Sequence, residues 1–99
     1  MKLSNEFEPI RVWAEEKGIP QKGDVKTQLI KLFEEAGELS KATLTRDADE
    51  VKDGIGDCVV VLVNLATLHG LKLEDCINSA YQVIKDRQGK MENGTFKKN

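Results

Sequence analysis

One apolar stretch limits how this 99-residue chain can fold more than any other feature of its sequence. Residues 58–68 read C-V-V-V-L-V-N-L-A-T-L, and a helix over them would be apolar on almost every side. Such a helix is normally surrounded by protein. Three neighbouring helices of so short a chain could barely enclose it, because a small domain hides only about 60–65% of its unfolded surface. We therefore predict an all-α, four-helix bundle that is completed by homo-oligomerisation, as a dimer or a tetramer.

The remaining sequence also favours helices, with no repeat and no linker long enough to divide it, so residues 1–99 are expected to form a single domain. Ser4 or Asn5 is expected to cap the first helix, and Asp24 the second. Asp47, with a glutamate three residues later, resembles a capping box for the third. The predicted helices run from the first cap to about residue 17, and over residues 25–43, 48–68 and 73–88.

We expect no sheet in this chain. A strand over residues 58–63 is the alternative for the apolar stretch, because residues 59–61 are all valine and favour β-structure. We reject it because no second strand candidate lies nearby, and an isolated strand leaves its backbone groups unpaired. Residues 89–99 are expected to form a polar tail that turns at Asn93-Gly94.

The charges are numerous but balanced, at 32% of the residues with a net charge of −2. This balance excludes the basic footprint of a nucleic-acid-binding protein. The N-terminus lacks the apolar region of a signal peptide. The apolar stretch is too short to span a bilayer and is interrupted by Asn64 and Thr67. Cys58 and Cys76 have no metal-type spacing and are interpreted as reduced core thiols. We expect a cytoplasmic protein with neither nucleic-acid nor membrane partners.

Six acidic residues form two clusters, on the second and third predicted helices. The clusters are Glu34, Glu35 and Glu38 in L-F-E-E-A-G-E-L-S-K, and Glu50, Asp53 and Asp57 in E-V-K-D-G-I-G-D. Steps of three and four residues place the second cluster on one helix face. Antiparallel packing across the turn at residues 45–47 would bring both clusters together, where carboxylates repel one another unless a cation lies between them. An oxygen-only ligand set favours magnesium, with manganese as a substitute, over zinc.

A solvated helix face is the alternative explanation for these acids. E-E-x-x-E is common on exposed helices, and Glu50 would complement the dipole at the start of the third helix. Asp57 and Asn64 favour the metal site, because both are polar residues at positions where burial is expected.

With these clusters the chain resembles the MazG-like all-α nucleoside triphosphate pyrophosphohydrolases, particularly the small stand-alone type of phages and bacteria. The family pattern is E-E-x-x-E on one helix and E-x-x-D on the next, followed by an apolar helix. Glu34, Glu35 and Glu38 match the first half and Asp57 matches the second, in a resemblance that spans roughly residues 13–90.

One departure from the family pattern concerns the second motif, where Gly54 stands in place of glutamate. Asp53 is the nearest substitute, four residues before Asp57 on the same helix face. We expect it to supply the missing oxygen, with Glu50 as an alternative ligand or as support for one.

The resemblance implies a magnesium-dependent enzyme that hydrolyses a nucleoside triphosphate between its α- and β-phosphates, giving monophosphate and pyrophosphate. Magnesium would neutralise phosphate charge and activate a water molecule. Glu35, Glu38 and Asp57 are expected to be metal ligands together with Asp53. Glu34 is expected to be a further ligand or the base that orients the water.

Substrate contacts are predicted on three helices. Lys31 lies one turn before the metal ligands, on a stripe of Gln28, Lys31, Glu35, Glu38 and Ala42. Lys85 and Arg87 are assigned to the phosphates, because family members commonly use lysine and arginine at the end of this helix. Trp13 is assigned to stacking on the base, with a core position as the alternative. Asn64 is assigned to the base or sugar, or to orienting a ligand.

Two other functions fit the same residues. A related substrate such as phosphoribosyl-ATP would need the same fold and metal site. A catalytically silent helical oligomer, with a binding or regulatory role, would need only the fold, and Gly54 would then mark a decayed site. Metal-dependent release of pyrophosphate separates the silent oligomer from the two enzymes.

Overall fold

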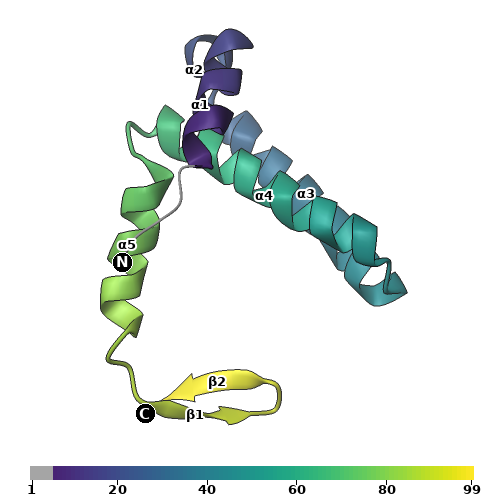
Figure 1. The fold of residues 1–99 in the computed structure, drawn as a ribbon, viewed down its shortest axis with the longest axis vertical. Helices are drawn as coiled ribbons and strands as arrows, with labels where there is room; N and C mark the ends of the chain where they lie inside the picture. Colours follow the sequence, from purple (N-terminus) through teal and green to yellow (C-terminus); the bar gives the residue numbers. More distant parts are fainter. Residues whose placement is uncertain (1–5) are drawn as a thin grey trace.

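The computed structural model describes residues 6–99, and Figure 1 shows its helices and its hairpin. The elements are α1 (Phe7–Glu16), α2 (Ile19–Lys22), α3 (Val25–Thr45), α4 (Ala48–Leu68), α5 (Leu73–Ile84), β1 (Gly89–Glu92) and β2 (Thr95–Lys98). The mainly helical fold is confirmed, and the four predicted helices correspond to α1, α3, α4 and α5. The predicted caps Ser4 and Asn5 lie outside the described residues.

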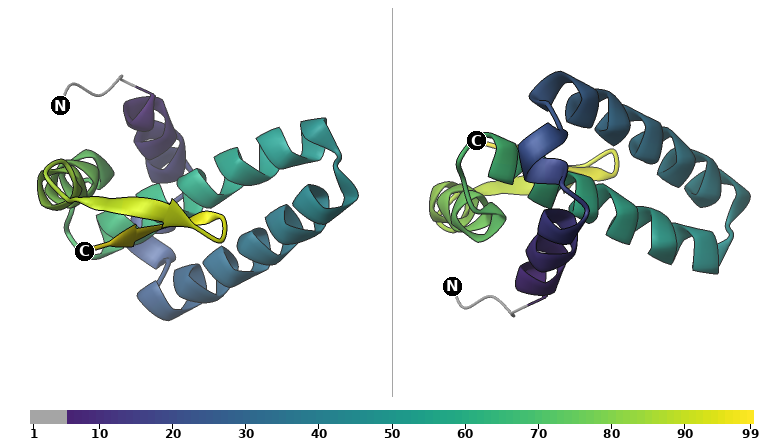
Figure 2. Two further views of the ribbon diagram at one scale, coloured as in Figure 1. Left: turned by 90° about the horizontal axis from the view of Figure 1, so that it is seen from below. Right: turned by 90° about the horizontal axis from the view of Figure 1, so that it is seen from above.

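The two long helices α3 and α4 lie side by side in opposite directions and form the framework of the chain (Figure 2). Asp24 begins α3 by accepting hydrogen bonds from the backbone N–H and the hydroxyl of Thr27, both at 2.9 Å. Asp47 begins α4 by accepting from the backbone N–H of Glu50 at 3.1 Å. Both predicted caps are confirmed. Arg46, with a φ of 57°, ends α3, so the connection is shorter than the predicted turn.

Gly54 lies at a close contact between α3 and α4. It is buried, and a Cβ atom there would lie 3.2–3.3 Å from the side chain and Cα of Leu39. Gly56 lies two residues on, and there a Cβ would meet no atom of the described chain within 4 Å. Glycine at position 54 therefore has a packing role between the helices.

We expect Gly54→Val to destabilise the protein by about 1–3 kcal/mol, because added atoms would force α3 and α4 apart. Gly56→Ala is the matched control, and we expect it to stabilise by about 0.5–1 kcal/mol because alanine favours helix more than glycine. Urea unfolding followed by circular dichroism measures both variants. Equal effects of the same sign would contradict the packing role of Gly54.

A half-buried ion pair connects the N-terminal helix α1 to the start of α5. The Nη1 and Nη2 atoms of Arg11 donate to the two carboxylate oxygens of Glu74, at 2.6 and 2.5 Å. Arg11 also donates to Glu8 one turn earlier, at 2.7 Å from Nη2. The hydrogen bonds and the charge of Arg11 lower the pKa of Glu74 to about 2. Two residues 63 positions apart in sequence thereby hold α1 and the start of α5 together.

The pKa of Glu74 predicts an acid-sensitive contribution to stability. Because the folded-state pKa is below the ordinary value of 4.5, the contribution is complete above about pH 4.5 and is lost as the pH falls to about 2. We expect Glu74→Gln to lower the free energy of unfolding by about 1–2 kcal/mol at pH 7, and by much less at pH 2. Urea unfolding at both pH values tests this, with Glu16→Gln on the exposed end of α1 as the control. A loss that does not depend on pH would contradict it.

α5 leaves α4 at a sharp bend and carries the C-terminal residues away from the other helices (Figure 1). The two helices are bent by 101° relative to each other. No single helix of the described residues is long and apolar enough to cross a membrane. Only α4 and α5 taken together meet that length and composition, across the bend.

Residues 89–98 form a hairpin where a polar tail was expected. α5 ends at Ile84 rather than near residue 88, and β1 pairs with β2 in antiparallel register, with Met91 opposite Phe96. Asn93 and Gly94, with φ of 51° and 81°, form the predicted turn. The expectation of no sheet is therefore wrong for this segment. Two consecutive positive φ angles give a turn whose twist suits paired strands, so the turn itself brings the flanking residues into register.

The core of the single chain is small, and much apolar surface stays exposed. Val61, Val63 and Ala66 of the predicted apolar stretch are buried, whereas Phe33 and Leu44 of α3 are 71% and 84% exposed. The radius of gyration is 15.7 Å, compared with about 13 Å for a compact domain of this length. Cys58 and Cys76 are free thiols, as predicted, but they are half-buried rather than in the core.

Candidate metal and nucleotide site

Carboxylates from α3 and α4 meet along one edge of the helix pair. A cavity of about 320 Å³ lies there, and Glu38 from α3 faces Glu50, Asp53 and Asp57 from α4 across it. We call these four residues the acidic edge. The antiparallel packing predicted from the sequence thus brings the two acidic clusters together, and Asp53 lies with them. Lys41, which the sequence did not single out, also lines this cavity.

Glu35 lies next to the acidic edge, in a position that disfavours its charge. Its side chain is 15% exposed. Loss of hydration raises the pKa of the Glu35 carboxyl, and the negative charges of Glu38 and Asp57 raise it further, while Lys31 partly offsets them. The carboxylates are therefore close enough to repel one another, which is the condition that a bound cation would relieve.

A second cavity, of about 260 Å³, opens on the other side of Asp57. Trp13 from α1, Lys31 and Glu35 from α3, and Asn64 from α4 line it together with Asp57. Gln28 also faces this space. The sequence had placed Gln28 on the stripe of Lys31 and Glu35 without assigning it a role, so helical spacing was the signal that could have identified it.

Asn64 is the most unusual residue of this second cavity. It is only 5% exposed, and its buried Oδ1 atom accepts no hydrogen bond from any described residue. An unpaired buried amide oxygen costs about 1–3 kcal/mol. The predicted burial is confirmed for Asn64 but wrong for Asp57, which is exposed and lines both cavities. A ligand in the second cavity could supply the missing donor to Asn64.

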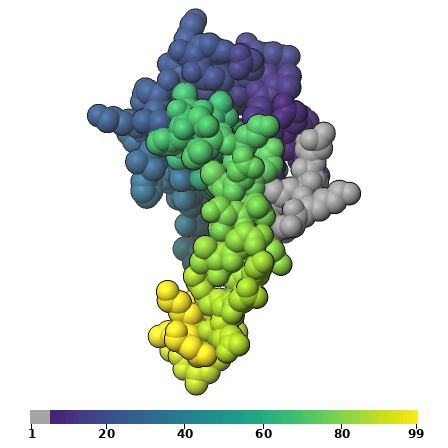
Figure 3. All heavy atoms as spheres, turned by 90° about the vertical axis from the view of Figure 1, so that its left-hand side faces the viewer, coloured from purple at the N-terminus to yellow at the C-terminus, as the bar shows by residue number. Residues whose placement is uncertain are grey.

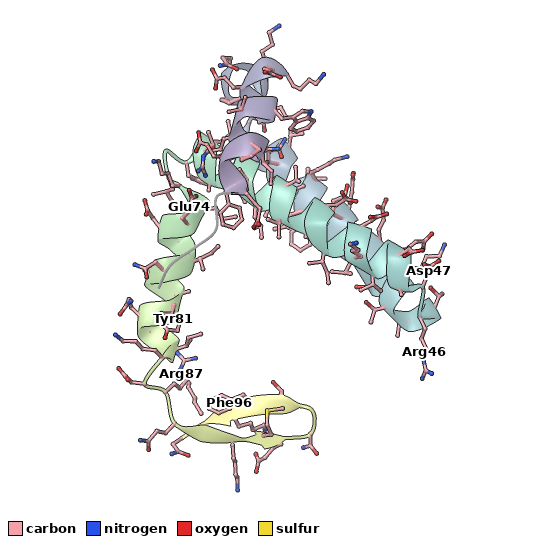
Figure 4. The ribbon with its side chains drawn as sticks, viewed as in Figure 1. Arg46, Asp47, Glu74, Tyr81, Arg87 and Phe96 are labelled. Carbon is pink, nitrogen blue, oxygen red and sulfur yellow. The ribbon has the colours of Figure 1, made fainter. Side chains whose placement is uncertain are left out.

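Three of the predicted site residues lie away from both cavities. Glu34 points to solvent beside Lys31, whose Nζ is 3.7 Å from its carboxylate. Lys85 and Arg87 follow α5, and Figure 4 shows Arg87 at the far end of that helix from α3 and α4. Within one chain, the structure does not bring Lys85 and Arg87 to the acidic edge.

The donor chemistry of the acidic edge suits a hard divalent cation, because it consists of carboxylate oxygens. Within residues 6–99, no three aspartate, glutamate, histidine or cysteine side chains already converge as a group that could hold a metal ion. A cation would therefore need to draw the side chains of Glu38, Asp53 and Asp57 inward.

The chain is thus a mainly helical domain in which an acidic edge lies beside a second cavity of mixed lining. The sequence model of the MazG nucleotide pyrophosphohydrolase domain matches residues 24–91, from the cap of α3 into β1. The chain therefore belongs to the MazG nucleotide pyrophosphohydrolase family, as its motifs suggested.

The chain is 44% identical over 57 residues to a protein of Haemophilus phage HP1 (strain HP1c1), described as an uncharacterized 18.2 kDa protein in the rep-hol intergenic region. The aligned part is 58% of this chain and 35% of the phage protein, so the chain covers about a third of that relative. No solved structure matches the chain.

Proposed function

We propose that this chain is a magnesium-dependent pyrophosphohydrolase that converts (deoxy)nucleoside triphosphates to monophosphate and pyrophosphate. The observation that carries the proposal is the position of Asp57, which lines both cavities. A cation site at the acidic edge would thus adjoin the cavity that contains Trp13 and the unpaired amide of Asn64. Membership in the family supports cleavage of a nucleotide anhydride at this place.

The acidic edge would hold the cation through Glu38, Asp53 and Asp57, with Glu50 beside them. When bound there, magnesium would offset the charge of the phosphates and lower the pKa of a water ligand. The cation is needed because the four carboxylates of the acidic edge would otherwise repel the negatively charged phosphates. Manganese offers the same ligand preference and would substitute for magnesium.

The other side chains would bind and orient the substrate. Lys31, whose Nζ lies 3.9 Å from a carboxylate oxygen of Glu35, would contact a phosphate oxygen beside the acidic edge. The Trp13 indole offers a face to the base, and Asn64 offers a hydrogen-bond acceptor. Glu35 rather than Glu34 would take the proton of the attacking water, since Glu35 lines the cavity and Glu34 does not.

We further propose that the functional protein is a homo-oligomer. Ile30, Phe33 and Leu44 are exposed on one side of α3, because steps of three and eleven residues return to nearly the same helix face. Exposed Ile55 adds apolar surface on α4. A second copy of the chain would cover this surface. Sedimentation velocity gives the oligomeric state directly.

Asp53→Asn tests the substitute for the missing glutamate at position 54. We expect magnesium-dependent turnover to fall about 10- to 100-fold, which is typical for losing a residue that supports a metal site. Glu50→Gln is the matched comparison, and a larger loss in that variant would make Glu50 the substitute. Unchanged turnover in Asp53→Asn would contradict the assignment of Asp53.

A substrate panel separates the proposal from its alternatives. Pyrophosphate release is measured from each nucleoside and deoxynucleoside triphosphate and from phosphoribosyl-ATP, with magnesium, with manganese and with EDTA. We expect metal-dependent turnover of at least one triphosphate. Turnover of phosphoribosyl-ATP alone would identify that compound as the substrate. A folded protein that turns over none of these compounds would favour the catalytically silent oligomer.

A further inference from the structure

The C-terminal hairpin has an apolar pair of side chains that the rest of the chain does not cover. Met91 and Phe96 face each other across the two strands and are 66% and 47% exposed. The Phe96 ring lies over Gly89, where a Cβ atom would come within 2.7 Å of its Cζ atom. The Phe96 ring thus packs against the backbone at Gly89, while about half of the residue stays exposed to solvent.

The hairpin stands apart from the helices. Figure 1 and Figure 3 show it beyond the end of α5, at the opposite end of that helix from α1 to α4. Among the described elements, β1 and β2 pack extensively only against each other. An isolated two-stranded hairpin is at best marginally stable in water. Its order and its exposed apolar pair therefore indicate a surface outside its own chain.

Charge points to a second copy of this chain as that surface. The hairpin carries Lys90, Lys97 and Lys98 against a single glutamate, and Lys85 and Arg87 precede it. The acidic edge and the exposed apolar side of α3 provide opposite charge and apolar contact on one helix pair. One chain thus carries both the basic hairpin and the acidic helix pair, but the two do not contact each other within that chain. In a two-fold symmetric dimer, the hairpin of each subunit could contact the helix pair of the other.

We propose that residues 89–98 are an arm that docks on the α3–α4 pair of a second copy of this chain. Met91 and Phe96 contact the apolar surface of the second copy. Lys98, which lies on the same hairpin face as Met91 and Phe96, and Arg87, which precedes the hairpin, then reach its acidic edge and contact the phosphates of the substrate. The docking stands independently of the proposed function, whereas the phosphate contact rests on it.

Photo-crosslinking tests the docking in the full chain. Phe96 is replaced by the photoreactive p-benzoyl-phenylalanine in a tagged copy, which is mixed with untagged protein and irradiated. We expect a tagged–untagged product whose crosslinked peptides map to α3 or α4. The same replacement at Thr95, on the opposite hairpin face, is the control and is expected to give much less of it. Crosslinks only within one chain, or equal yields from both positions, would overturn the docking.

Subunit complementation tests the shared site. Asp57→Asn, with an intact arm, is co-expressed with a Met91→Ser/Phe96→Ser variant, which has an intact acidic edge. Each variant alone is expected to have little activity, with unchanged helix content by circular dichroism. For a dimer, half of randomly mixed molecules carry both chains and one of their two sites is complete, so we expect recovery to about a quarter of the wild-type rate.

The two measurements distinguish a failure of the docking proposal from a failure of the proposed function. No recovery in the mixture, when the wild-type protein is active, would overturn the delivery of phosphate contacts between subunits. Full activity of the Met91→Ser/Phe96→Ser variant by itself would overturn it as well. If the wild-type protein turns over no nucleotide, the proposed function fails, and the crosslinks still decide whether the hairpin docks on a second copy.

Discussion

Replacing Asp57 by asparagine is expected to lower kcat about 100- to 1,000-fold, with the helical fold intact. The side chain keeps its shape and loses only its charge, at the position shared by the two cavities. A metal ion contributes several kcal/mol to stabilising charge in a transition state, and each 1.36 kcal/mol corresponds to about a factor of ten in rate. Steady-state pyrophosphate release at saturating magnesium and nucleotide measures the loss.

The control for this variant is Asp49→Asn, in the first turn of α4. Asp49 is exposed and lies outside both cavities, so we expect its turnover to stay within about twofold of wild type, since surface changes away from special features have small effects. Asp57→Asn should unfold no more easily than wild type without metal, because one repelling carboxylate has been removed. Near-normal turnover in Asp57→Asn would contradict the central position given to this residue.

Asn64→Leu is expected to change stability and substrate use in opposite directions. Leucine removes an unpaired buried amide, so the free energy of unfolding should rise by about 1 kcal/mol. The substrate would lose the hydrogen-bond acceptor that Asn64 Oδ1 provides. Because such a contact contributes about 1–3 kcal/mol, we expect kcat/KM to fall roughly 10- to 100-fold. Urea unfolding and initial rates at low substrate concentration measure the two effects.

Asn78→Leu is the matched control, because Asn78 is exposed on α5 and accepts a hydrogen bond from Gln82 at 3.3 Å. We expect it to change neither quantity appreciably. If Asn64→Leu were less stable than wild type and kept its kcat/KM, then Asn64 would be a structural residue of the core. The opposed signs therefore distinguish substrate binding from packing.

The framework of the site was predictable because local rules act strongly there. Asp24 and Asp47 lie at true helix starts, and each accepts the backbone hydrogen bond that its position predicts. Once α3 and α4 are fixed and joined by a short turn, helical spacing decides which acids meet. Glu38, Asp53 and Asp57 could therefore be grouped from their spacing along the chain alone.

The parts that were not predicted depend on contacts that spacing does not encode. The short helix α2 follows Gly18, whose φ of 78° sets a left-handed entry. The hairpin has only one apolar cross-strand pair, Met91 and Phe96, so its strands lacked the usual alternating pattern. The distance of Arg87 from the acidic edge depends on the bend between α4 and α5, which is a tertiary feature.

Gly54 shows how a motif position can change its role. The family pattern made it a missing ligand, whereas the structure places it in close contact with Leu39 of the neighbouring helix. Asp53 lines the same cavity one residue earlier. Gly54 at the helix contact and Asp53 beside it can together replace the single glutamate of the family pattern. The Asp53→Asn variant tests the metal-site role, and the Gly54→Val variant tests the packing role.

The most direct test of the proposed activity is product analysis of the wild-type protein acting on its preferred triphosphate. Anion-exchange chromatography and ³¹P NMR identify the products formed with magnesium and with EDTA. The proposal predicts nucleoside monophosphate and pyrophosphate in equal amounts with magnesium, and no reaction with EDTA. Diphosphate with inorganic phosphate as the products, or turnover that continues in EDTA, would contradict it.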